Sequence, residues 1–199
     1  MDAGGLAGVQ RIALGAMLEA MSDPARTIAP AVDPSRPIGP GVRIGHVHLK
    51  VADIERALAF YRGVLGFELT QRFGEGAAFL SAGGYHHHIG LNTWESEGGR
   101  PPAPGTTGLY HLAILYPTRA ELADALRRLI AAGIQLDGAA DHGVSEALYL
   151  RDPDGNGVEL YWDLPQERWP RTDDGGLAMY TRRLDLEGLL REPLARGAS

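Results

Sequence analysis

The histidines of this chain are its most informative residues. All seven lie between positions 46 and 142, in a region that contains an internal repeat. His46 and His111 stand at the start of two similar strand–helix units, and Glu159 lies in the closing strand of the second unit. Two imidazoles and one carboxylate, held on a repeated β framework, are the ligands that a mononuclear non-haem Fe(II) site needs. These three residues are therefore candidates for a metal site.

The surroundings of Glu159 strengthen this hypothesis. Glu159 alternates with Val158 and Leu160, which places its carboxylate opposite two apolar neighbours. An isolated carboxylate on the concave face of a half-buried strand is costly unless it is paired or ligated. A single histidine is more often an ordinary core or surface residue. Three positions matched across a repeat favour a site.

The first repeat unit combines one strand, one helix and three further strands. Apolar and polar residues alternate in IGHVHLKVAD, which is typical of a half-buried strand. Asp53 can cap a helix over residues 54–65, where apolar residues recur at helical spacing, and Gly66 ends it. Short strands separated by Gly-rich turns are then expected at 67–73, 77–82 and 86–94.

The second unit repeats this order after a polar, Gly/Pro-rich stretch at 95–107. A strand is expected at 109–115 and an amphipathic helix at 118–132. The remaining strands are expected at 134–136, 147–151 and 157–162, the last two joined in a hairpin by DPDGNG. The order is βαβββ twice, an internal duplication. We predict an α+β fold of paired βαβββ modules, forming an open cup-shaped mixed sheet with helices outside and a ligand pocket within.

The pattern also divides the chain into segments. Residues 1–41 are expected to be a disordered or extended N-terminal segment, with Met21 as an alternative start. Residues 42–164 form the paired domain, with modules at about 42–95 and 108–163. Residues 165–199 are a C-terminal tail with a short helix at 184–191. The tail either leads toward a further domain or packs back through Trp169 and Tyr180.

Composition restricts the partners and the compartment. A net charge of −6 and a pI near 5.6 argue against nucleic acid or an anionic membrane as a partner. The absence of cysteine excludes disulfides and thiolate sites and fits a reducing cytoplasm. No run reaches the about 18 apolar residues that a membrane span needs. We expect a cytoplasmic protein that binds a small molecule, and the exposed edge strands of a lone cup favour a homodimer.

Three stretches resemble a known family. GHVHLKVADIERALAFYRGVLGF, GLYHLAI and LRDPDGNGVELYW are similar to the vicinal oxygen chelate superfamily, which includes glyoxalase I, fosfomycin-resistance proteins and extradiol dioxygenases. The resemblance covers about residues 44–162. It implies that His46, His111 and Glu159 are metal ligands.

Within this family, the stretch YHHHIGLNTW resembles the extradiol ring-cleavage dioxygenases. Glyoxalase I-like proteins take a fourth metal ligand, a carboxylate, from the corresponding strand, but this stretch contains no acidic residue before Glu95. Extradiol enzymes carry an acid–base histidine there. The resemblance implies that His87 has this role, with His86 or His88 as alternatives, and strand alternation would place His87 on the face opposite to those two.

Two further residues match the extradiol pattern. Tyr149 precedes Glu159 by ten residues, where these enzymes place a tyrosine that hydrogen-bonds the catecholate. His142 matches a histidine that closes over the substrate, if one gap is allowed. The resemblance implies ring cleavage of a catechol-type aromatic diol, with Fe(II) or Mn(II) as the metal and O2 as co-substrate. His87 would move a proton, and Tyr149 and His142 would stabilise charge on oxygen.

Two alternatives stay open at this point. One is a glyoxalase-like metal-dependent lyase or isomerase, which the missing fourth acid disfavours. The other is a non-catalytic binding protein of the bleomycin-resistance type, which the metal-ligand pattern disfavours. Many extradiol enzymes also carry two such double units per chain, whereas this chain contains one.

Overall fold

A computed structural model describes residues 35–195 and divides the chain into two units, residues 1–44 and 45–199. Of the first unit only residues 35–44 are described. Most of the predicted N-terminal segment, and Met21 with it, therefore lies outside the described residues. All helices and strands of the described part of the chain belong to the second unit.

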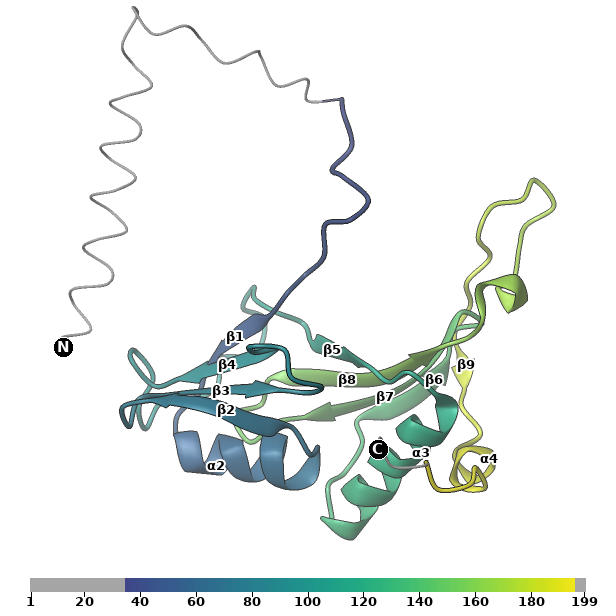
Figure 1. The fold of residues 1–199 in the computed structure, drawn as a ribbon. Helices are drawn as coiled ribbons and strands as arrows, with labels where there is room; N and C mark the ends of the chain where they lie inside the picture. The colour runs from purple at the N-terminus through teal and green to yellow at the C-terminus, as the bar shows by residue number, and fades with distance from the viewer. Residues whose placement is uncertain (1–34, 196–199) are drawn as a thin grey trace, which may run out of the picture. The chain divides into compact units, whose positions relative to one another are not determined.

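The first module builds a four-stranded sheet in the order β1-β4-β3-β2 (Figure 1). Its strands are β1 (Val47–Lys50), β2 (Glu68–Phe73), β3 (Ala77–Ser81) and β4 (Ile89–Asn92). β1 and β4 are parallel, and the other pairs are antiparallel. The Asp53 side chain caps helix α2 (Ile54–Leu58) by accepting from the Arg56 backbone N–H at 3.0 Å, and the helix continues as the π-helical η1 (Ala59–Val64).

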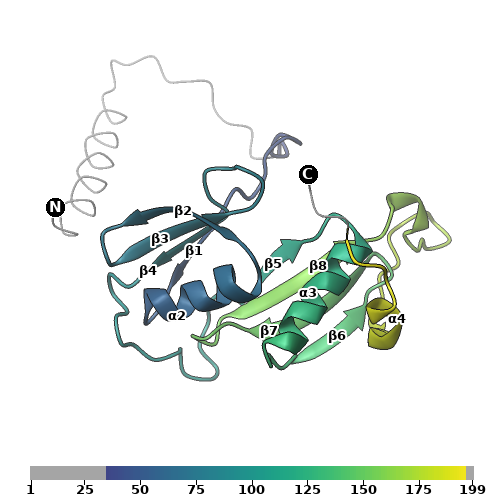
Figure 2. The ribbon, with the colours of Figure 1, turned by 60° about the horizontal axis from the view of Figure 1, so that its bottom comes forward.

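The second module repeats this arrangement in a five-stranded sheet of order β5-β8-β7-β6-β9. Its strands are β5 (Leu112–Leu115), β6 (Gly138–Asp141), β7 (Ser145–Arg151), β8 (Gly157–Asp163) and β9 (Arg182–Arg183). β5 and β8 are parallel, as β1 and β4 are. Helix α3 (Arg119–Ala131) lies along one face of this sheet, as α2 does on the first (Figure 2). The predicted α+β class with paired βαβββ modules is confirmed.

One hydrophobic core and one turn connect the two modules. The core contains fully buried leucines of both modules, among them Leu80, Leu91, Leu122, Leu148 and Leu160. The Tyr61 hydroxyl of η1 donates to Asp152 at 2.9 Å. Asp154 accepts from the Ala52 backbone N–H at 3.0 Å. The β7–β8 hairpin turn therefore binds the helix of the first module.

Three predicted strands differ from the structure. The strand expected at 86–94 is only Ile89–Asn92, because regular pairing with both β1 and β3 begins at Ile89. The strand expected at 134–136 is absent. Gly133, with φ +67°, ends helix α3, and the Ile134 N–H bonds back to Leu129 O at 2.9 Å, so β6 begins later. β5 is shorter than the predicted 109–115.

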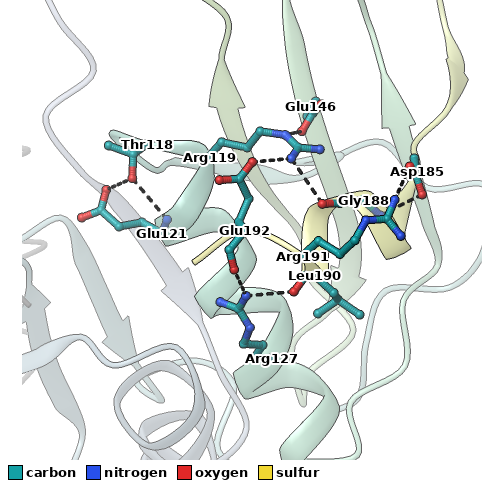
Figure 3. Close-up of polar contacts among 10 residues, drawn as sticks. All are labelled: Thr118, Arg119, Glu121, Arg127, Glu146, Asp185, Gly188, Leu190, Arg191 and Glu192. Atoms are coloured by element: carbon teal, nitrogen blue, oxygen red, sulfur yellow. Dashed lines mark hydrogen bonds and ion pairs between the residues drawn. The ribbon is translucent and has the colours of Figure 1, made fainter. Parts of the chain in front are cut away.

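The segment after β8 packs back on the second module. It contains the short η2 (Gln166–Arg168), the strand β9, which pairs with β6, and helix α4 (Leu186–Leu190), which lies against α3. Leu184 and Leu189 are buried in the core. Figure 3 shows the polar contacts that hold its end to α3 and β7. Among the described residues, no helix is long and apolar enough to cross a membrane.

Candidate active site

His111 and Glu159 form the centre of the candidate site. His111 directly precedes β5, and Glu159 lies in β8, opposite Ala113 in the parallel pairing of these strands. The two neighbouring strands therefore place the side chains next to each other. His111 Nε2 lies 2.9 Å from Glu159 Oε2, and the Glu159 side chain is only 13% exposed.

This pair fits two ligands of one divalent cation. His111 Nε2 and Glu159 Oε2 lie 2.9 Å apart, so the two donor atoms point toward the same space. Imidazole nitrogen and carboxylate oxygen are also the donors of a mononuclear Fe(II) site. His111 Nδ1 is buried without a hydrogen-bond partner in the described part of the chain.

Tyr149 lies on the other side of Glu159. It is in β7, directly opposite Glu159 in the antiparallel pairing, and its hydroxyl donates to Glu159 Oε1 at 2.9 Å. Burial raises the pKa of Tyr149 well above its ordinary value, and the hydrogen bond to Glu159 and the charge of that carboxylate raise it further. The phenol is therefore protonated at neutral pH and remains a hydrogen-bond donor.

His142 extends this line of contacts. It follows β6, and its Nε2 lies 2.8 Å from the Tyr149 hydroxyl. Its Nδ1 lies 3.2 Å from the backbone oxygen of Tyr180 and 3.1 Å from Thr181 Oγ1. The structure thus brings together four predicted site residues, His111, Glu159, Tyr149 and His142. Thr181 is a contact that sequence reasoning missed, because no pattern in the sequence indicates that β9 pairs with β6.

His46 and His87 meet in the first module. His46 directly precedes β1 and is exposed, and its ring centroid lies 4.5 Å from that of His87. His87 also packs on Phe79, at 5.0 Å between centroids. Burial lowers the pKa of His87 below its ordinary value, and repulsion from a protonated His46 and the neighbouring histidines lowers it further.

The three consecutive histidines do not alternate as a strand would. They precede β4, and His86 Nδ1 lies 2.8 Å from His87 Nδ1, which opposite faces of a strand would prevent. The strand alternation that was predicted for His86, His87 and His88 is therefore wrong, because these residues precede the strand. His88 points instead to Ser81 Oγ, at 3.1 Å from Nδ1. Of the three, His87 is the one whose ring packs on His46.

The structure brings together two of the three predicted ligands. Among residues 35–195, no three His, Asp or Glu side chains lie close enough together to hold one metal ion. His46 therefore remains a predicted third ligand and lies beside His87. A pocket of about 230 Å³ is lined by His111, Tyr149 and the exposed Tyr110, among others.

Comparisons with known proteins agree with this architecture. Residues 43–160 match the model of the Glyoxalase/Bleomycin resistance protein/Dioxygenase superfamily. The chain is 46% identical over 149 residues to catechol-2,3-dioxygenase of Bacillus subtilis (strain 168), a match that covers 75% of this chain and 51% of that protein. It is 35% identical over 123 residues to biphenyl-2,3-diol 1,2-dioxygenase 3 of Rhodococcus globerulus, covering 61% of this chain and 63% of that one.

A solved structure supports the fold. The crystal structure of a glyoxalase/dioxygenase from Nostoc punctiforme matches with a TM-score of 0.53 and 21% identity, over 68% of this chain and all of that one (100%). The chain spans about half the length of the Bacillus relative (51%). The family model alone covers more than half of the chain and confirms the resemblance predicted from the sequence. The chain belongs to the Glyoxalase/Bleomycin resistance protein/Dioxygenase superfamily.

Proposed function

We propose that this chain is an extradiol ring-cleaving dioxygenase that acts on a catechol-type aromatic diol. Fe(II) is the proposed metal, with Mn(II) as the alternative, and O2 is the proposed co-substrate. The observation that carries the proposal is the line of contacts from His111 through Glu159 and Tyr149 to His142. Two relatives that are named as dioxygenases of vicinal aromatic diols support it.

In this proposal His111 Nε2 and Glu159 Oε2 hold the metal, and His46 is the predicted third ligand. When bound, the metal would lower the pKa of the diol hydroxyls and bring the diol and O2 together for reaction. Only Glu159 Oε2 faces His111, because Oε1 accepts the hydrogen bond from Tyr149. The tyrosine thus orients the carboxylate.

The remaining residues have proton-handling roles. Tyr149 keeps its phenol proton because its pKa is raised. In this structure the hydroxyl donates to Glu159, and it would turn to a negatively charged oxygen of the diol when the diol binds. His142 Nε2 contacts the same hydroxyl. His87 is neutral at pH 7 because its pKa is lowered, so its ring can accept a proton from a diol hydroxyl.

The geometry gives the glyoxalase-like alternative less support. That alternative needs a carboxylate in the strand that ends the first module. β4 reads Ile-Gly-Leu-Asn and contains no acidic residue. We also retain a homodimer as a proposal, since β1 and β5 each form the end of a sheet and, among residues 35–195, have one strand edge without a partner strand.

The test is a reconstitution of the full chain. The protein is purified without oxygen, loaded with Fe(II) and mixed with catechol and O2, and oxygen uptake is followed together with the yellow ring-cleavage product. We expect both signals, and we expect His111→Ala and Glu159→Ala to abolish them. Glu68→Gln, on the exposed face of β2, is the control and retains activity. One bound metal per chain without oxygen uptake would contradict the proposal.

A further inference from the structure

The two ring nitrogens of His142 have different partners. Nε2 lies 2.8 Å from the Tyr149 hydroxyl. Nδ1 lies 3.2 Å from the Tyr180 carbonyl oxygen and 3.1 Å from Thr181 Oγ1. The Tyr149 hydroxyl has one hydrogen, which it donates to Glu159 Oε1, so toward His142 its oxygen can only accept. Nε2 of the neutral ring must then carry the hydrogen, and the lone pair on Nδ1 accepts from the Thr181 hydroxyl.

The backbone at Tyr180 and Thr181 is held against His142 by further contacts. The Tyr180 N–H donates to His142 O at 3.2 Å, so the two residues are joined at both backbone and side chain. The Tyr180 ring packs on Gly143, where an added Cβ would lie 2.6 Å from Tyr180 Cε1. The Arg182 guanidinium lies 4.1 Å from the centroid of the Tyr180 ring. β9 then pairs with β6 immediately after Thr181.

The end of the segment is held by Arg119 of α3 (Figure 3). Its Nε donates to Glu146 of β7 at 2.7 Å, and its Nη1 donates to Glu192 at 2.7 Å. Arg127 donates to the Leu190 carbonyl oxygen at 3.0 Å. The Arg119 contacts are largely shielded from solvent, with side-chain exposures of 24%, 16% and 29% for Arg119, Glu146 and Glu192. Such a network holds a segment more firmly than an isolated surface pair does.

We propose that Thr181 is a positioning residue of the candidate active site. Its hydroxyl donates to Nδ1 and thereby fixes the ring orientation and the Nε2–H tautomer of His142. The Nε2–H group then points at the Tyr149 oxygen, which can only accept because its own hydrogen is donated to Glu159. The catalytic consequence of this arrangement rests on the proposed function, whereas the tautomer does not.

The tautomer is measured by 15N NMR of the full chain labelled at histidine. The His142 signals are assigned by their loss in His142→Asn. We expect neutral His142 to carry its hydrogen on Nε2. Thr181→Val removes the donor to Nδ1 and leaves the Tyr180 carbonyl oxygen beside it, so we expect this variant to increase the Nδ1–H population and Thr181→Ser to restore the original spectrum. An Nδ1–H tautomer in the unmodified protein, or an unchanged spectrum in Thr181→Val, would overturn the inference.

The second part of the test measures kcat and KM of the Fe(II)-loaded protein. Loss of one hydrogen bond predicts that Thr181→Val lowers kcat about three- to tenfold, with little change in KM for catechol, and that Thr181→Ser recovers most of it. Thr172→Val is the matched control, since the Thr172 hydroxyl bonds to Asp174 within the same segment. If the unmodified protein cleaves no diol, the proposed function fails while the NMR result still decides the role of Thr181. If Thr181→Val shifts the tautomer of His142 but leaves kcat unchanged in an active enzyme, the inference that Thr181 affects catalysis is wrong.

Discussion

His111 Nε2 lies 2.9 Å from Glu159 Oε2, while the other oxygen of the same carboxylate accepts the Tyr149 hydroxyl. Each carboxylate oxygen therefore has a separate partner. This division fixes the plane of the carboxylate, because rotation would break both contacts. His111 directly precedes β5, Glu159 lies in the parallel neighbour β8, and Tyr149 lies in β7, the antiparallel neighbour of β8. The site thus depends on strand register more than on loops.

Glu159→Gln tests the metal centre. The amide keeps the shape of the side chain but removes the negative charge that a divalent cation requires. We expect the affinity for Mn(II), which can be measured in air by calorimetry, to fall at least about a hundredfold. Glu68→Gln removes an exposed carboxylate in the other sheet and should bind Mn(II) as the unmodified protein does. Equal affinities of the two variants would exclude Glu159 as a ligand.

Tyr149→Phe separates orientation from metal binding. The variant removes the donor between Glu159 and His142 and leaves the ring in place. We expect kcat for ring cleavage to fall about 10- to 100-fold, with metal stoichiometry retained. The control is Tyr116→Phe, because Tyr116 follows β5 and interacts with Arg128 and Glu121 of α3. A kcat equal to that of the control would exclude a role for the phenol.

Much of the second half of this site could be predicted because it depends on local pattern. Alternation in the closing strand and the short DPDGNG turn together determine that Tyr149 lies opposite Glu159. The position of His46 could not be predicted in this way. It depends on how one sheet packs against the other, and no spacing within a single module reports that packing. Thr181 escaped prediction because its contact with His142 spans 39 residues.

Prediction of the fold also succeeded where residues act locally and failed where tertiary contacts decide. The N-cap Asp53 and the hairpin could be predicted from residue types with local roles. The errors fall where tertiary hydrogen bonding decides. Ile134 is apolar, but its N–H closes the end of α3 and does not join a sheet. β9 has only two residues, both arginines, so its sequence carries no strand pattern.

Tyr61→Phe tests the connection between the modules. Burial raises the pKa of the Tyr61 phenol, and the charge of Asp152, to which it donates, raises it further. Since the folded state holds this proton more tightly, the stabilisation is complete below about pH 10, the ordinary tyrosine pKa, and is lost as pH rises above it. We expect Tyr61→Phe to lower the free energy of unfolding at pH 7 by about 1–3 kcal/mol and to reduce its fall above pH 10.

Urea denaturation at pH 7 and at pH 10.5 measures both effects. Tyr85→Phe is the control, because Tyr85 is exposed and its hydroxyl makes no hydrogen bond to Asp152. It should show the stability and the alkaline slope of the unmodified protein. A Tyr61→Phe variant with the same slope as the control would show that the phenol of Tyr61 does not couple to folding.

Gly143→Ala tests how closely the C-terminal segment must approach His142. Gly143 has φ +76° and touches the Tyr180 ring, whereas Gly175 has φ +85° and open space around it. Alanine costs about 1–2 kcal/mol at either position because of the positive φ. Only at Gly143 does it also displace the Tyr180 ring.

We therefore expect Gly143→Ala to lower the melting temperature further than Gly175→Ala does. We also expect it to open residues 165–185 to limited proteolysis and to reduce ring cleavage, since displacing Tyr180 moves a partner of His142. Gly175→Ala carries the same backbone cost without the contact, so it should resist protease as the unmodified chain does. If the two variants behave alike, the positive φ alone accounts for Gly143, and close packing of Tyr180 is not needed to hold His142.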